Sequence, residues 1–147
     1  MRDGLVIERV VEANEEAVEA FARLVPQLSS SAPPDRTRLA SIIAQPGTVV
    51  LFARGIDRDI EGTLTLVVFT VPTGRRALIE DVVVDAPNRG RGVASALVRR
   101  AIEIADAAGC QAVDLTSRPS RVEANALYAR LGFARRETNV YRYSLTR

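Results

Sequence analysis

The chain has 147 residues, enough for one domain with a sizeable hydrophobic core and too few for two. Hydrophobic residues make up 47% and charged residues 26%, which excludes a disordered chain, a collagen-like fibre and a disulfide-stapled miniprotein. All 20 basic residues are arginine, and the net charge is only +2. This small excess does not indicate a nucleic-acid-binding protein, which usually has a dense basic face.

Missing residue types exclude several kinds of chemistry. The chain has no histidine, so the usual Ser-His-Asp and Cys-His catalytic pairs cannot form. It has no lysine, which removes Schiff-base catalysis and the phosphate-binding lysine of a P-loop. One cysteine without histidine cannot build a zinc site, so no metal is expected. Carboxylates, tyrosines, hydroxyls, arginines, one thiol and backbone dipoles remain as catalytic groups.

The first half of the chain predicts two helices among four strands. Asn14 is a favourable N-cap for a helix that ends near residue 25, and Asp35 for a shorter one that ends before Gln45. The strands are expected at 5–11, 48–53, 60–71 and 76–84. Short polar turns between the last three indicate an antiparallel meander.

The second half has a different pattern. Apolar residues at spacings of three and four predict an amphipathic helix over 92–108, which Gly109 ends. A strand over 111–116, a helix over 121–131 and one or two strands over 133–145 complete the chain. We therefore expect a single domain, residues 1–147, of mixed α/β class.

The chain is expected to be cytoplasmic and to have no membrane partner. Its first residues lack the basic start and apolar stretch of a signal peptide. The longest apolar-rich stretch, 63–71, is far shorter than the roughly 20 residues that a membrane span needs.

The segment 82–95 predicts an anion site. A strand enters a loop that opens a helix, and the N–H groups at a helix start have no partner within the helix. Gly90 and Gly92 allow close approach of the backbone, and Arg89 and Arg91 add positive charge. The expected ligand is a phosphate or pyrophosphate. A plain strand-to-helix connection is the alternative; a dinucleotide site fits poorly, because Ser95 stands at the third glycine position.

These residues resemble a known family. The run Arg89-Gly90-Arg91-Gly92-Val93-Ala94 matches the Arg/Gln-x-x-Gly-x-Gly/Ala signature of the GNAT superfamily of N-acetyltransferases. Residues 79–85, 125–128 and 131–133 are similar to that family at the expected places. The resemblance implies a central, mostly antiparallel sheet of about six to seven strands, flanked by about four helices and split open after the fourth strand.

The resemblance also implies where acetyl-CoA binds. Its pyrophosphate would contact the N–H groups of residues 91–95, and its pantetheine arm would pair like an added strand with residues 82–84. Asn125 would bond the pantetheine amide, with a plain surface asparagine as the alternative. The expected cofactor-binding residues are Val82, Val83, Val84, Arg89, Gly90, Arg91, Gly92, Val93, Ala94, Ser95 and Asn125.

Glu80 and Tyr128 are the expected catalytic residues. A carboxylate can take the proton of an amine, and Glu80 is chosen although Asp81 or a water relay stays open. Strand alternation puts Glu80 on one face with Val82 and Val84, unless a bulge shifts it. Tyr128 would protonate the departing thiolate, as a tyrosine at this place does in the resembled family. A solvated glutamate and a packed tyrosine are the alternative interpretations.

The resemblance implies transfer of the acetyl group to a primary amine of a small molecule or peptide, by direct attack in a ternary complex. The acidic pair Glu80-Asp81 is similar to that of the glucosamine-phosphate N-acetyltransferases, without fixing a sugar as substrate. A non-catalytic module that binds or senses acyl-CoA is the alternative function. The resembled family often dimerises, so a homodimer is also expected.

Overall fold

The computed structural model describes residues 3–147, which form two compact units, one up to Thr116 and the other Ser117–Arg147. None of the helices in this described part is long and apolar enough to cross a bilayer. The first unit contains β1 (Val6–Arg9), α1 (Glu15–Leu24), η1 (Val25–Gln27), α2 (Arg36–Ala44), β2 (Thr48–Arg54), β3 (Ile60–Val71), β4 (Gly74–Val84), η2 (Ala86–Asn88), α3 (Val93–Ala107) and β5 (Val113–Asp114). The second contains α4 (Val122–Arg130).

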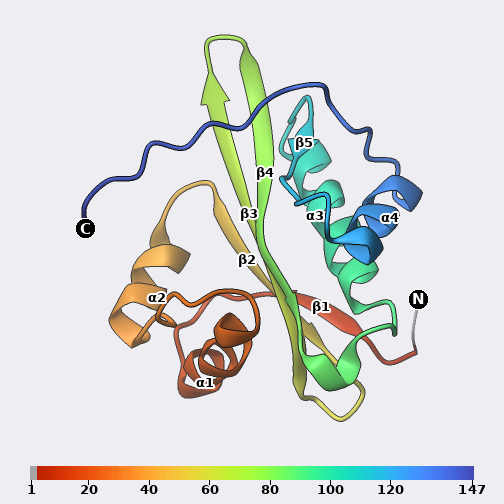
Figure 1. Cartoon of the computed structure of the whole chain (residues 1–147). Helices are drawn as coiled ribbons and strands as arrows, with labels where there is room; N and C mark the ends of the chain where they lie inside the picture. Colours follow the sequence, from red (N-terminus) through yellow and green to blue (C-terminus); the bar gives the residue numbers. More distant parts are fainter. Residues whose placement is uncertain (1–2) are drawn as a thin grey trace. The chain divides into compact units, whose positions relative to one another are not determined.

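The sheet has five strands in the order β1-β2-β3-β4-β5 (Figure 1). The first four are antiparallel, which confirms the predicted meander, and β5 runs parallel to β4. The β4–β5 register includes only two pairs, Ala77 with Val113 and Leu78 with Asp114. The sheet therefore opens beyond Leu78 along β4, as the resemblance implied, although it has five strands instead of six to seven.

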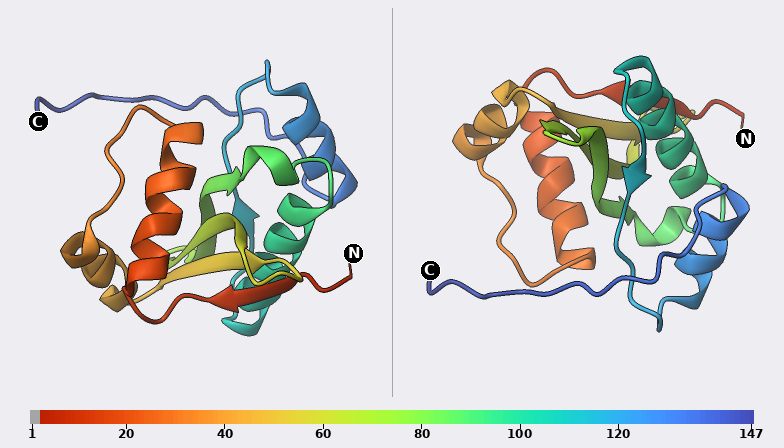
Figure 2. Two further views of the ribbon diagram at one scale, coloured as in Figure 1. Left: turned by 90° about the horizontal axis from the view of Figure 1, so that it is seen from below. Right: turned by 90° about the horizontal axis from the view of Figure 1, so that it is seen from above.

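Helices cover both faces of this sheet. Figure 2 shows α1 and α2 on one face and α3 on the other. On the α1 side the core includes Phe21, Leu24 and Phe52, and the two phenylalanine rings are 5.3 Å apart. On the α3 side, a Cβ on Gly62 would lie 3.1 Å from the side chain of Val93. The first turn of α3 is thus packed directly on β3.

The helix boundaries agree with the expected ones to within about two residues. The Asn14 side chain accepts a hydrogen bond of 2.9 Å from the Ala17 N–H, and Asp35 accepts one of 2.8 Å from the Arg38 N–H. These local contacts satisfy N–H groups that have no partner within the helix. The four predicted helices are confirmed.

The prediction of one or two strands over 133–145 is wrong. Residues 133–147 contain no helix or strand, and they leave large apolar side chains exposed. An alternating pattern forms a strand only where a neighbouring edge supplies hydrogen bonds. Within the second unit the structure describes no strand that could supply that edge.

Candidate cofactor-binding and catalytic site

The loop from β4 to α3 is the segment for which the sequence predicts an anion site. Gly90 and Gly92 have φ angles of +76° and +83°, a conformation that glycine adopts without steric cost. A Cβ added at either glycine would meet no atom within 4 Å. The backbone here faces open space, so a ligand can approach it closely.

The N-terminus of α3 supplies hydrogen-bond donors to this space. The first bond of the helix runs from the Ala96 N–H to the Gly92 carbonyl, at 3.1 Å, and no side chain caps the helix. The N–H groups of Val93, Ala94 and Ser95 therefore precede the helical ladder and have no partner within it. They carry the partial positive charge of the helix dipole, which suits the oxygens of a pyrophosphate. The Val93 side chain is buried, so only its backbone is available.

The end of β4 presents a free backbone edge. The Asp85 N–H donates to the Glu61 carbonyl at 2.8 Å, so Val84, opposite Gly62, belongs to a non-hydrogen-bonded pair. The N–H and carbonyl of Val84 consequently point away from β3. The carbonyl accepts a hydrogen bond from Arg89 Nε, and the N–H is placed to pair with an extended ligand. Val83 is the opposite case: it bonds β3, and its side chain is buried in the core beneath α1.

A β-bulge changes the face on which Glu80 lies. Glu80 pairs with Thr65 and Val83 with Thr63, so β4 has one extra residue between these pairs. Asp81 takes up the bulge with a φ of +51°. Glu80 therefore shares its face with Leu78 and Val83, and the expectation that it lies with Val82 and Val84 is wrong. Because Val83 packs in the α1-side core, Glu80 is exposed on the face that α1 and α2 cover.

The second unit holds Asn125 and Tyr128 on α4. The Asn125 side-chain amide donates to the Arg118 carbonyl at 2.9 Å. The ring of Tyr128 meets that of Phe133 edge-on, with centroids 5.8 Å apart. Partial burial raises the pKa of Tyr128 above its usual 10, and the charge of Arg121 opposes this shift. The hydroxyl is therefore protonated at neutral pH and can donate a hydrogen bond.

The two arginines beside the glycines have different surroundings. Arg89 donates from Nε to the Val84 carbonyl at 3.1 Å and from Nη2 to the Gln27 side chain at 3.2 Å. Arg91 is exposed, and within residues 3–147 its side chain has no hydrogen-bond or ion-pair partner. Sequence reasoning missed Gln27, because it lies 62 residues from Arg89 and no local pattern connects the two.

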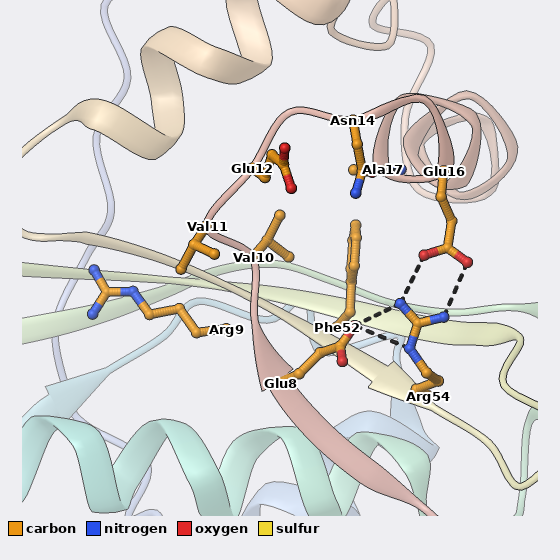
Figure 3. Close-up of a pocket in the computed structure, with 10 residues that line it drawn as sticks. All are labelled: Glu8, Arg9, Val10, Val11, Glu12, Asn14, Glu16, Ala17, Phe52 and Arg54. Atoms are coloured by element: carbon orange, nitrogen blue, oxygen red, sulfur yellow. Dashed lines mark hydrogen bonds and ion pairs between the residues drawn. The ribbon is translucent and has the colours of Figure 1, made fainter.

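A hollow lies between β1 and α1, away from this loop, with a volume of about 220 Å³ (Figure 3). Its main polar feature is Arg54, whose guanidinium contacts Glu8 at 2.6 Å and Glu16 at 2.8 Å. The hydrogen bond from Arg54 lowers the pKa of Glu16. Since these charges satisfy one another and none of the predicted site residues lines the hollow, we assign the cluster to stability. The described residues contain no group of three or more acidic, cysteine or histidine side chains that could hold a metal.

Comparison with known proteins shows the family of the chain. The model of the Acetyltransferase (GNAT) family matches residues 11–133. A probable glucosamine 6-phosphate N-acetyltransferase 2 from Oryza sativa is 50% identical over 60 residues, which are 41% of this chain and 34% of that protein. The N-alpha-acetyltransferase MAK3 of Arabidopsis thaliana is 47% identical over 70 residues, 48% of this chain and 36% of that protein. The chain thus aligns with about a third of each curated relative.

Among solved structures, an acetyltransferase from Trypanosoma brucei superposes with a TM-score of 0.78 at 28% identity. The match covers 96% of this chain and 99% of that one. The fold is therefore that of an acetyltransferase over nearly the whole chain.

Proposed function

Because the chain belongs to the Acetyltransferase (GNAT) family, we propose that it is an acetyl-CoA-dependent N-acetyltransferase acting on a primary amine. The observation that supports this most is the open N-terminus of α3 at the glycine loop, next to the free edge of β4. The family match crosses the boundary between the two units, which supports a single catalytic domain over residues 1–147.

The donors and spaces of this loop fit coenzyme A. Backbone N–H groups of residues 91–95 would bind the pyrophosphate, with Gly90 and Gly92 leaving room for it. Arg91 would add charge to the same site. The Val84 backbone would hold the pantetheine arm, together with Val82, and Asn125 would bond its amide. Acetyl-CoA supplies the activated acetyl thioester; the chain binds and orients it.

In this proposal Glu80 is the general base and Tyr128 is the general acid. An alkyl amine has a pKa near 10, so most of it must lose a proton before it attacks. Glu80, exposed on β4, would accept that proton directly or through water, and Asp81 is its neighbour at the bulge. Tyr128, protonated at neutral pH, would donate a proton to the departing thiolate. Attack is then direct, within a ternary complex.

Calorimetric titration with acetyl-CoA tests the cofactor site. Gly92→Glu places a carboxylate in the phosphate site and should weaken binding about a hundredfold or more. Gly109→Glu is the matched control. Gly109 has a φ of +79°, a Cβ added there would meet no atom within 4 Å, and it lies at the other end of α3. Both variants introduce the same charge and similar backbone strain, so only the location differs. Equal loss in both variants would contradict the assignment.

Turnover separates this function from the alternative. Free thiol released from acetyl-CoA in the presence of amines identifies an enzyme. Micromolar binding without turnover on a broad amine panel would instead identify a non-catalytic acyl-CoA-binding module. No binding at millimolar acetyl-CoA would overturn both functions. A parallel titration with NAD that shows no binding would exclude a dinucleotide site.

The acceptor is proposed only as a primary amine of a small molecule or peptide. The names of the two curated relatives suggest which amines to assay first: glucosamine 6-phosphate and the N-terminal amine of a peptide. The first acceptor carries a phosphate and the second does not, so their relative kcat/KM values tell which class the chain prefers. A cytoplasmic location and a homodimer complete the proposal, without a metal, nucleic acid or membrane as partner.

A further inference from the structure

A hydrogen-bond network fastens the start of the cofactor loop to the end of α1. The side chain of Gln27, the last residue of η1, is at its centre. Its Nε2 donates to Asp85 Oδ1 at 2.8 Å, and its Oε1 accepts from the Ala86 N–H at 2.9 Å and from Arg89 Nη2 at 3.2 Å. One side chain thus contacts three residues of the segment between β4 and the glycine loop.

Further contacts hold this network in place. Arg23 on α1 bonds the other oxygen of Asp85, at 3.0 Å, and donates to the Ile60 carbonyl at 2.7 Å. Bonds from Gln27 and Arg23 lower the pKa of Asp85 against the opposing effect of its burial. Asp85 is therefore ionised at neutral pH and fixed from two sides, which orients the Gln27 amide with its oxygen toward Ala86 and Arg89.

The same contacts decide what Arg89 can do. Its Nε donates to the Val84 carbonyl, which points away from β3 along the free edge of β4. With Nη2 on Gln27, the guanidinium is held across the turn from β4 into the loop. Arg89 therefore sets the shape of this turn. Arg91 has no such partners among the described residues, so its guanidinium is available to bind the phosphate.

From these contacts we propose that Gln27 is a positioning residue for acetyl-CoA binding. It acts through Arg89 and Ala86 to hold the glycine loop, and hence the N–H groups at the start of α3, in the conformation that accepts the pyrophosphate. The proposal rests on the proposed function. It assigns a cofactor-binding effect to a residue of η1 that lies outside the phosphate loop.

The test compares Gln27→Met with Gln45→Met. Each removes a side-chain amide that makes hydrogen bonds; Gln45 donates to Thr48 Oγ1 at 2.7 Å, in the turn between α2 and β2. Both variants should lower the melting temperature. Gln27→Met alone should raise Kd and KM for acetyl-CoA about tenfold, with kcat at saturating cofactor changed less than about threefold. A purely structural role would lower Tm and leave Kd as in Gln45→Met.

A double-mutant cycle identifies the route. If Gln27 acts through Arg89, then Gln27→Met should raise Kd less in an Arg89→Met background than in the wild type. Full additivity of the two changes in Kd would overturn the proposed coupling. Binding by the wild-type protein, measured in the same titrations, tests the proposed function itself: its absence overturns both, whereas wild-type binding with an unaffected Gln27→Met variant overturns only this inference.

If Gln27→Met fails to fold, hydrogen exchange in the wild-type protein tests whether the Gln27 contacts are coupled to acetyl-CoA binding. Coupling between loop and ligand is reciprocal, so acetyl-CoA should slow exchange of the Ala86 N–H along with those of residues 91–95 in the wild-type protein. Slowed loop amides with an unchanged Ala86 N–H would overturn the proposal.

Discussion

Tyr128 is the residue that we propose as proton donor, and partial burial keeps its hydroxyl protonated at neutral pH. Burial raises the pKa of Tyr128, so the wild-type enzyme should show no loss of kcat from tyrosine ionisation in the neutral range. Tyr128→Phe keeps the ring contact with Phe133 and removes the hydroxyl. We expect kcat to fall about tenfold to a hundredfold, with Kd for acetyl-CoA changed less than about twofold.

Tyr141→Phe is the control for that measurement. Tyr141 is 88% exposed, so removal of its hydroxyl should leave kcat unchanged. An unchanged kcat in Tyr128→Phe as well would remove the general-acid role, and a parallel rise in Kd would indicate cofactor binding instead.

Glu16 gives the protein a pH-dependent contribution to stability. Its pKa in the folded state lies below the ordinary 4.5, because Arg54 donates a hydrogen bond to it. A carboxyl group with a lowered folded pKa stabilises above its unfolded pKa and loses this effect as the pH falls through the folded value. Glu16→Gln should therefore lower the free energy of unfolding at pH 7, by less than about 1 kcal/mol since the side chain is half exposed, and the difference should vanish in acid.

Urea unfolding from pH 7 down to pH 3 measures this difference. Glu19→Gln is the control at pH 7: Glu19 is exposed on the same helix and has no ion pair among the described residues, so its replacement should change the free energy of unfolding less than Glu16→Gln does. A constant gap between wild type and Glu16→Gln across the range would contradict the ion-pair explanation.

At single residues, the direction of a side chain was hard to predict where a β-bulge interrupts the strand. Strand alternation puts Glu80 on one face unless a bulge shifts it, and the bulge at Asp81 does reverse the faces of the residues after it. A positive φ at an aspartate depends on how β3 and β4 pair, which no local pattern contains. Arg89 was expected to supply charge to a phosphate; its contacts with Gln27 and Val84 arise only once α1 packs on the sheet.

Helix α1 shows why whole elements were easier to predict. Its N-cap and first turn lie within three residues of one another, so the sequence contains the complete signal for the start of this helix.

Asn14→Ala should lower the free energy of unfolding by about 1 kcal/mol, because the Ala17 N–H loses its acceptor. Asn139→Ala, in the exposed tail, is the control in the same denaturation experiment and should change stability by less than about 0.5 kcal/mol. Equal effects would show that Asn14 does not cap α1.

Strands depend on partners far along the chain, so some of the predicted strands are present in the structure and others are not. The meander from β2 to β4 was predictable because short turns such as Pro72-Thr73 bring each strand back on its neighbour. The tail over 133–145 has similar alternation without such a turn, and it forms no strand. The opening of the sheet after β4 followed from the family resemblance, since no composition or spacing in β4 indicates where β5 stops pairing.

At the scale of the whole molecule, the tail supports the proposed homodimer. Val140, Tyr141, Tyr143 and Leu145 are between 67% and 89% exposed, and burial of such side chains against a second copy would remove a large apolar area from water. Light scattering should then give twice the mass of one chain for the wild type. Replacing the two aromatic rings, Tyr141→Ser with Tyr143→Ser, should shift the population to monomer, because each ring buries much apolar surface at low entropic cost.

The control for this shift is Tyr128→Phe, which leaves the tail intact and should stay dimeric. The double tail variant should also keep its acetyl-CoA affinity if the phosphate loop and the β4 edge bind cofactor within one chain. A wild-type monomer at every concentration would refute the homodimer. A dimer that persists without the tyrosines would place its interface elsewhere on the chain, and dissociation accompanied by loss of acetyl-CoA binding would mean that the site is complete only in the dimer.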